Sequence, residues 1–426
     1  MRSSGLRYFA TNRQMENLGR VHSETKGSLK EKDHESVKKA DRDLRIKLQQ
    51  GGYYFVDMRS YMAYYFGAVD TTKMPLGAVV QTSDETVFEG FLADQRIGRV
   101  AICIHGFNVH LPAAHQWFRI LVETMRNAAN GGPFIIEKDD LDDHKNAREG
   151  SLIALIGFSW PSNGSVLAYN RDQMDAASSA QALAGLISRI HLHGKKVDLI
   201  CHSMGNYLAC NMLQGLITKT FIPACFSSEY VNEWQKGLAE RKSAAKVLSE
   251  GDRTALLQAN MRRLQRHDGT DADSRKSGED CFIDRYIMLA PDVERRHITK
   301  APGNTTESDY IGPFHSGLEH LVREVWNIYS RFDSALNVSN WEKKPKDALL
   351  SVAEGLNSLT FGLLDFLERN PDYKWEQRLG SAPHPSTSPG NVVSVNATEL
   401  AGRKIDHSDH IDSRQLAERI AKILTA

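Results

Sequence analysis

The chain has 426 residues, and its 53 basic side chains balance its 53 acidic ones to a net charge of zero. This balance excludes a nucleic-acid-binding protein of the globally basic kind. A hydrophobic fraction of 41% with 25% charged residues is typical of a folded globular protein and excludes a highly charged disordered chain. The length allows two domains.

The termini and the cysteines indicate a protein of the cytoplasm. No apolar stretch follows Met1 as a signal peptide would require, and no run reaches the ~18 apolar residues of a membrane span. The chain has five cysteines, and none is spaced like a zinc ligand pair. We therefore expect reduced thiols, a cytoplasmic location, no transmembrane segment and no cofactor.

Strands and helices alternate along most of the chain. A strand is predicted over residues 6–11, followed by a densely charged stretch at 24–50 and an apolar, aromatic-rich stretch at 53–80. Further strands are predicted at 99–105, 152–160, 196–201, 285–289, 324–329 and 391–395, and helices at 113–129, 174–193, 204–216 and 411–424. Continuous apolar strands between helices predict an α/β fold with a mainly parallel sheet, covered by helices on both faces.

The segment from 198 to 206, Asp-Leu-Ile-Cys-His-Ser-Met-Gly-Asn, predicts a nucleophile elbow. Such an elbow places a serine on a sharp turn between a strand and a helix, with small residues on both sides. Ser203 is that serine, and Gly205 is the small residue after it. Cys201 stands where the G-x-S-x-G pattern has its first glycine. The alternative is a serine that only caps the following helix.

The sequence His105-Gly106-Phe107-Asn108 follows an earlier strand. The backbone N–H of Phe107 or its neighbour is predicted to form an oxyanion hole together with the N–H of Met204. An ordinary turn between a strand and a helix is the alternative. We also expect four residues near the nucleophile to contact substrate: His105, Gly106, Trp160 and His202.

A catalytic acid and base follow Ser203 in the order that an α/β triad requires. Asp333 comes just after the strand that ends near residue 329, and His407 comes after the last strand. Asp292 is the competing acid, one strand earlier, and His410 is the competing base. An aspartate that opens a helix is often only a cap, which is the alternative for Asp333.

These residues predict acyl-transfer chemistry. His407 would take the hydroxyl proton of Ser203 as it attacks an acyl carbon, and Asp333 would hold the imidazole in the required tautomer. A metal site at the acid–histidine cluster is a disfavoured alternative, because such loops are more often solvated surface. Its ligands would be His407, Asp409, His410 and Asp412.

Several motifs together resemble a bacterial family of α/β-hydrolases of unknown function, related to lipases and esterases. The matching pieces are Phe9 to Arg13, His105 to Asn108, Phe158 to Ser162, His202 to Asn206, Ala290 to Asp292, Asp333 to Leu336 and Arg378 to Gly380. The resemblance implies an α/β-hydrolase sheet and a serine nucleophile, and it implies no substrate.

We expect residues 1–98 to form an N-terminal strand and a charged helical extension packed on the core, and residues 99–426 to form the catalytic domain. A charged insertion at 230–280 and an apolar helix at 346–368 interrupt that domain. They could form a lid, an oligomer contact or a surface for a protein partner.

The predicted function is a serine esterase or lipase acting on a small-molecule or lipid ester. A catalytically silent binding module and a thioesterase or acyltransferase are the alternatives.

Overall fold

A computed structural model describes residues 6–12, 53–58, 83–107, 109, 111–128, 132–162, 169–218, 281–300, 311–339 and 378–426. Three segments singled out in the sequence lie outside these residues: the charged stretch at 24–50, the insertion at 230–280 and the apolar helix at 346–368.

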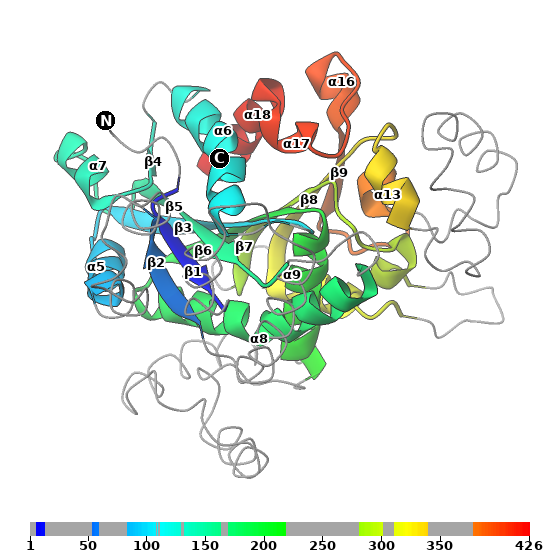
Figure 1. The fold of residues 1–426 in the computed structure, drawn as a ribbon, viewed down its shortest axis with the longest axis horizontal. Helices are drawn as coiled ribbons and strands as arrows, with labels where there is room; N and C mark the ends of the chain where they lie inside the picture. Colours follow the sequence, from blue (N-terminus) through cyan, green and yellow to red (C-terminus); the bar gives the residue numbers. More distant parts are fainter. Residues whose placement is uncertain are drawn as a thin grey trace, which may run out of the picture.

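One nine-stranded sheet forms the centre of the described structure (Figure 1). The strands are β1 (Tyr8–Thr11), β2 (Tyr54–Asp57), β3 (Ile97–Ile104), β4 (Phe134–Ile135), β5 (Leu152–Ser159), β6 (Lys196–His202), β7 (Ile283–Leu289), β8 (Val322–Tyr329) and β9 (Val392–Asn396). Their order is β2-β1-β5-β3-β6-β7-β8-β9, and β4 pairs with β5. Every pairing is parallel except that of β1 with β2. The parallel sheet predicted from the sequence is therefore confirmed.

Helices cover both faces of this sheet (Figure 1). The helices are α5 (Ser83–Leu92), α6 (Leu111–Ala128), α7 (Lys138–Asp143), α8 (Tyr169–Leu192), α9 (Met204–Thr218), α12 (His315–Leu321), α13 (Ser334–Ser339), α16 (Ala397–Ala401), α17 (Asp409–Asp412) and α18 (Arg414–Thr425). The first apolar core contains buried residues of α5, α8, α9 and α12, and the second contains those of α6 and α18.

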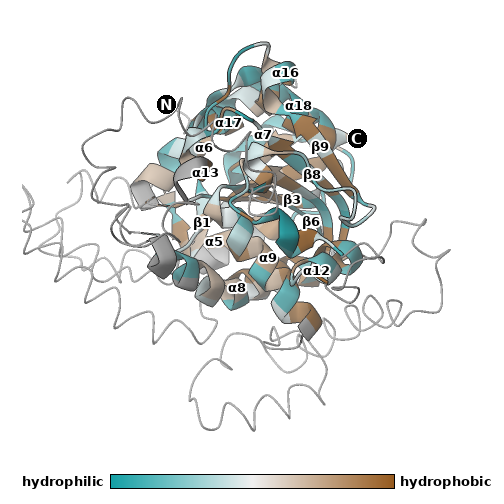
Figure 2. Cartoon of the chain, turned by 90° about the vertical axis from the view of Figure 1, so that its right-hand side faces the viewer, coloured by the Kyte–Doolittle hydropathy of each residue, from teal (hydrophilic) through white to brown (hydrophobic). Residues whose placement is uncertain are grey.

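The strands carry apolar residues on both faces because the strands contribute to both cores. On β3, Ile102 and Ile104 belong to the core beneath α8 and α9, whereas Ala101 and Cys103 belong to the core of α6 and α18. Side chains alternate along a strand, so a strand covered on both faces presents apolar residues to both. Figure 2 shows the apolar colour gathered on these central strands.

Strands β1 and β2, which lie ahead of position 98, belong to the same sheet as the rest, because β2 pairs with β1 and β1 pairs directly with β5. The sequence did not indicate β2, β4, α5 or α7. Strand β4 has two residues and α7 has the sequence KDDLDD, so neither carries an apolar periodicity that could be recognised. Among the described residues, no helix is both long enough and apolar enough to cross a bilayer.

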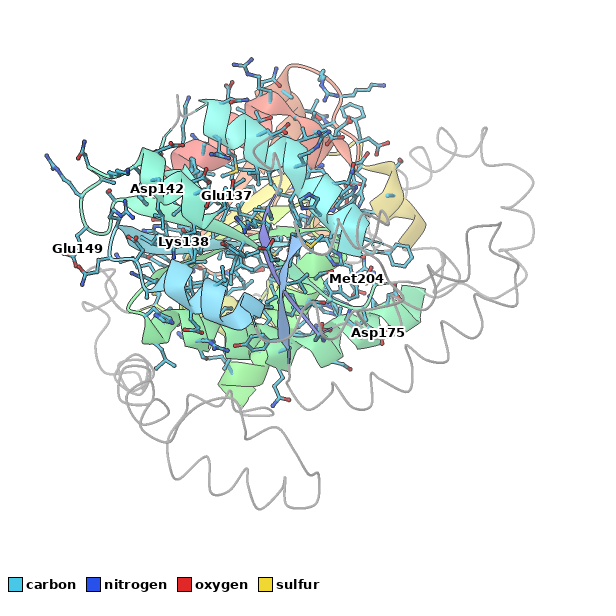
Figure 3. All side chains as sticks on the ribbon, turned by 60° about the vertical axis from the view of Figure 1, so that its left-hand side comes forward. Glu137, Lys138, Asp142, Glu149, Asp175 and Met204 are labelled. Atoms are coloured by element: carbon cyan, nitrogen blue, oxygen red, sulfur yellow. The ribbon has the colours of Figure 1, made fainter. Side chains whose placement is uncertain are left out.

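The two ends of the parallel strands can be told apart by labelled residues in Figure 3. Glu137, Asp142 and Glu149 gather near the edge where β5 begins, and Met204 lies toward the other side, where β6 has ended. Ligand sites of open α/β sheets lie at the carboxyl ends of the strands. The carboxyl edge of the sheet is therefore the expected place of the site.

Candidate active site

Ser203 occupies a strained turn between β6 and α9. Its φ is +51°, a left-handed conformation that costs a non-glycine residue roughly 1–3 kcal/mol. The backbone around it holds this turn: the N–H of Ser203 donates to the carbonyl of Leu289 at 3.0 Å, and its own carbonyl accepts from the N–H of Asp292 at 3.2 Å. Ser203 stands at the tip of this turn, where a nucleophile elbow has its serine, and it is buried.

Two glycines allow the turn after β3 to pack directly on this elbow. A Cβ on Gly205 would lie 2.6 Å from the carbonyl oxygen of His105, and a Cβ on Gly106 would lie 2.7 Å from the Cβ of Ser203. Neither position has room for a side chain. Cys201, at the position of the first glycine in the pattern, is fully buried in the core, so the elbow accommodates this departure.

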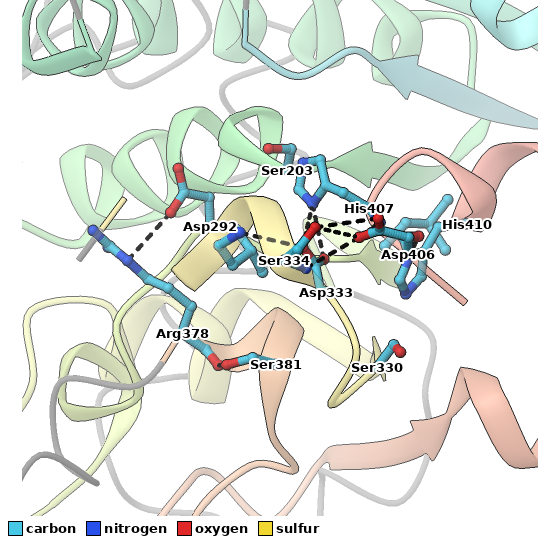
Figure 4. Close-up of polar contacts among 12 residues, drawn as sticks. Ser203, Asp292, Ser330, Asp333, Ser334, Arg378, Ser381, Asp406, His407 and His410 are labelled. Atoms are coloured by element: carbon cyan, nitrogen blue, oxygen red, sulfur yellow. Dashed lines mark hydrogen bonds and ion pairs between the residues drawn. The ribbon is translucent and has the colours of Figure 1, made fainter. Parts of the chain in front are cut away.

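Asp333 and His407 meet at the carboxyl ends of β8 and β9 (Figure 4). Both carboxylate oxygens of Asp333 contact Nδ1 of His407, at 2.8 and 3.0 Å. Asp333 is fully buried, and it also accepts the N–H of Leu336 at 3.2 Å. The carboxylate of Asp333 therefore caps the helix that follows it and also contacts His407, so the two interpretations of this residue do not exclude each other.

The environment of His407 favours its protonated form. Burial by itself lowers the pKa of this imidazole, but the hydrogen bond to Asp333 and the negative charges of Asp333, Asp292 and Asp406 outweigh it, so the pKa is raised above the ordinary value of histidine. In Figure 4 the side chain of Ser203 lies beside the ring of His407. No hydrogen bond is drawn between them, which is common before substrate binds.

The competing acid and base have other partners. Asp292 is buried and pairs with Arg378, whose Nε lies 3.2 Å from its carboxylate. His410 is fully buried, and its Nδ1 donates to the carbonyl of Asp406 at 3.1 Å. Burial lowers the pKa of His410 to about 4. The described hydrogen bond between a carboxylate and an imidazole at this site is that of Asp333 with His407.

The expected oxyanion groups lie at the elbow. Met204 opens α9, and the first N–H groups of a helix have no partner within that helix. Phe107 lies in the turn after β3, which Ser162 braces: its hydroxyl donates to the carbonyl of Gly106 at 3.1 Å and accepts from the N–H of Val109 at 3.2 Å.

His105 and Trp160, two of the residues expected to contact substrate, are buried and hydrogen-bonded within the protein. The indole Nε1 of Trp160 donates to the carbonyl of His105 at 2.9 Å, and the two rings stack at 5.6 Å. Nε2 of His105 bonds to Ser159 at 3.0 Å. These contacts fix the turn that carries Gly106. A direct contact of His105, Trp160, Gly106 or His202 with substrate stays a prediction.

Sequence reasoning missed the residues that hold the base loop. The carboxylate of Asp406 accepts from the N–H of His407 at 2.8 Å and from the N–H and hydroxyl of Ser334 at 3.1 and 3.0 Å. The hydroxyl of Ser330 donates to the carbonyl of Ile405 at 2.5 Å. The sequence shows Asp406 directly before His407, but the hydrogen bonds of its carboxylate to Ser334, which follows Asp333, form only in the folded chain.

Within the described ranges, no group of three or more histidine, cysteine, aspartate or glutamate side chains is arranged to hold a metal ion. The cluster that contains His407, Asp409, His410 and Asp412 therefore does not form such a group. Within this cluster, the carboxylate of Asp409 accepts from the N–H of Asp406 and forms an ion pair with Arg403 at 3.1 Å.

Comparison with known proteins places the chain in a family. The family model described as "Alpha/beta hydrolase of unknown function (DUF900)" matches residues 80–347. The chain is also 39% identical over 430 residues to "Uncharacterized protein alr1448" of Nostoc sp., an alignment that covers 99% of this chain and 93% of that protein. No solved structure matches the chain significantly.

Proposed function

Because the chain belongs to the alpha/beta-hydrolase family of unknown function, we propose that it is a serine hydrolase that cleaves a carboxylic ester or a related acyl bond. Ser203 is the nucleophile, His407 the general base and Asp333 the acid that orients it. The observation that carries this proposal is the bidentate contact of the buried Asp333 carboxylate with Nδ1 of His407, beside a serine held at a positive φ.

The mechanism follows from this arrangement. With Nδ1–H donated to Asp333, the free Nε2 of His407 accepts the hydroxyl proton while the oxygen of Ser203 bonds to the acyl carbon. The N–H groups of Met204 and Phe107 stabilise the oxyanion. The intermediate then collapses: the bond to the leaving oxygen breaks, and that oxygen takes the proton from His407. Water repeats these steps on the acyl-enzyme and releases the acid.

The electrostatics suit this cycle. Asp333 stabilises the imidazolium that forms when His407 takes the proton, and the carboxylates of Asp292 and Asp406 add to that stabilisation. The raised pKa of His407 makes it a stronger base than an isolated imidazole. General-base catalysis of this kind contributes roughly 10²–10⁴-fold to a rate.

A fluorophosphonate probe tests the proposal. The serine oxygen attacks phosphorus and fluoride leaves, so only an activated serine is labelled. We expect labelling of the full-length protein and none of Ser203→Ala. Ser151→Ala is the matched control, because Ser151 precedes β5 at the opposite edge of the sheet, and it should be labelled as strongly as the unaltered protein. A folded protein that resists the probe would favour the binding module.

A panel of p-nitrophenyl esters of increasing chain length, run beside acyl-CoA, assigns the substrate class. We expect turnover of the esters. Faster turnover of acyl-CoA would indicate a thioesterase or an acyltransferase with the same triad, because acyl specificity depends on pocket shape and not on the triad. A cytoplasmic location and a lipid-like acyl substrate stay predictions.

A further inference from the structure

His202, the residue before the nucleophile, lies between the segment that carries His407, helix α6 and the turn after β3. It is fully buried. Its Nε2 lies 2.9 Å from the backbone carbonyl oxygen of His407. Its ring meets the ring of His407 edge-on at 4.7 Å and the ring of Trp117, on α6, at the same distance. A side chain at Gly106 would meet Nδ1 of His202 at 3.1 Å.

The contact with a carbonyl fixes the tautomer of His202. A carbonyl oxygen only accepts hydrogen bonds, so Nε2 must carry the proton. Burial, with the nearby imidazoles of His407, His410 and His105, lowers the pKa of His202 well below its ordinary value, so the ring is neutral and Nδ1 carries a lone pair. Nδ1 has no hydrogen-bond partner in the described part of the chain. The donated bond from Nε2 is therefore the polar contact that this buried ring makes.

We propose that His202 is a positioning residue for the base: its Nε2–H holds the main chain of His407 against the nucleophile elbow. The proposal rests on the proposed function, since it takes His407 as the base. His202 is adjacent to Ser203 in the chain, so one side chain fixes the distance between the two loops that exchange the proton.

The base loop needs such a tie because it has little regular structure. His407 lies in a turn between α16 and α17. Asp406 holds its N–H from the side of the acid loop, and His202 holds its carbonyl from the side of the nucleophile. A misplacement of catalytic groups by about 1 Å can cost roughly 100-fold in rate, so loss of either tie should reduce turnover more than substrate binding.

Two substitutions separate positioning from packing. In glutamine the amide nitrogen is as many bonds from Cα as Nε2 is in histidine, so His202→Gln can still donate to the carbonyl of His407. In asparagine the amide nitrogen corresponds to Nδ1 and falls short of that carbonyl. Both variants replace the ring with a neutral polar amide, so any role of the ring itself in packing is lost in both.

The first measurement does not require activity. The pKa of the His407 imidazole is followed by NMR in the unaltered full-length protein and in both variants, with His407→Gln used to assign the signal. The groups that face this ring are Asp333, Asp292, Asp406, His202 and His410. In His202→Asn we expect the pKa to fall by about 1 pH unit as the ring leaves Asp333, and in His202→Gln we expect little change. Equal values in all three proteins would overturn the proposal.

The second measurement is kinetic. We expect kcat on the best ester to fall roughly 10- to 100-fold in His202→Asn and by less than about 3-fold in His202→Gln, with KM nearly constant in both. A higher KM at unchanged kcat would overturn the positioning role and support substrate contact by His202. If the pKa responds as expected but Ser203 never reacts with fluorophosphonate, the hydrolase proposal fails and the positioning of His407 stands.

Discussion

Replacing Asp333 by asparagine distinguishes the two candidate acids most directly. Asparagine keeps the shape of the buried side chain, and its amide oxygen can still accept the N–H of Leu336 that Asp333 accepts at 3.2 Å. The amide NH₂ then faces Nδ1 of His407, which must become the acceptor. The proton moves to Nε2, the atom that should receive the proton of Ser203, so the base is blocked in the wrong tautomer.

The expected loss is large. A triad whose aspartate is replaced by asparagine loses about 10⁴-fold in kcat, which corresponds to about 5 kcal/mol of barrier. The matched control is Asp292→Asn, which removes a carboxylate of similar burial that pairs with Arg378 at 3.2 Å. We expect this variant to lose stability, because the Arg378 guanidinium is then buried with one fewer anionic partner. We expect it to lose far less turnover per folded molecule than Asp333→Asn, because the Asp292 carboxylate acts on His407 through its charge.

The assay is the rate of p-nitrophenyl ester hydrolysis, corrected for the folded fraction measured by circular dichroism. Fluorophosphonate labelling of Ser203 gives an independent rate for the first chemical step. If Asp333→Asn keeps activity within about tenfold of the unaltered protein while Asp292→Asn loses about 10³-fold or more, Asp292 is the acid, and the geometric argument from Asp333 is refuted.

Three further predictions follow from the site. The acid limb of the pH profile of kcat/KM should have its midpoint above about 6.5, because His407 has a raised pKa and must be neutral to act as base; a midpoint at or below that value would contradict this. Gly205→Ala should lower the free energy of unfolding by about 1–3 kcal/mol in a urea denaturation measurement, since its Cβ would lie 2.6 Å from backbone. Gly90→Ala is the control: its Cβ would have no atom within 4 Å, so its stability should be unchanged or raised. Asp406→Asn should reduce kcat by roughly tenfold, because it weakens the bond to the N–H of His407. The control is Asp412→Asn, which alters an exposed carboxylate at the end of α17 and should retain kcat.

The sheet was predictable from the sequence because each of its longer strands is buried on both faces. β5 is buried over all eight residues, and a run of that kind between two helices has few other interpretations. The elements that were missed are short or polar, such as β4 and α7. They are held by pairing with β5 and by ion pairs such as that of Asp140 with Arg126, which connect positions far apart in the sequence.

The candidate site was predictable in its residue types but not in its connections. The elbow is a local pattern, so Ser203, Met204 and Gly205 could be read from the sequence together. The contact of Asp333 with His407 joins positions separated by 74 residues, and spacing alone left Asp292 and His410 open. The bridge from Asp406 to Ser334 joins the segments that follow β9 and β8, and the bond from His202 to His407 joins the last residue of β6 to the segment after β9. No periodicity in the sequence predicts either contact.

The three histidines around the elbow show how one environment can produce opposite behaviour. Burial lowers the pKa of each ring, and for His202 and His410 nothing reverses it: both bind backbone carbonyls, and the pKa of His410 falls to about 4. His407 is the ring in contact with a buried carboxylate, and its pKa rises. Groups whose environments separate their pKa values in this way take different roles in catalysis. Of these three rings, His407 is the one whose surroundings favour the protonated form, which suits it to accept a proton from Ser203. His202 and His410 stay neutral because they are buried, and their hydrogen bonds can hold the loop that carries His407.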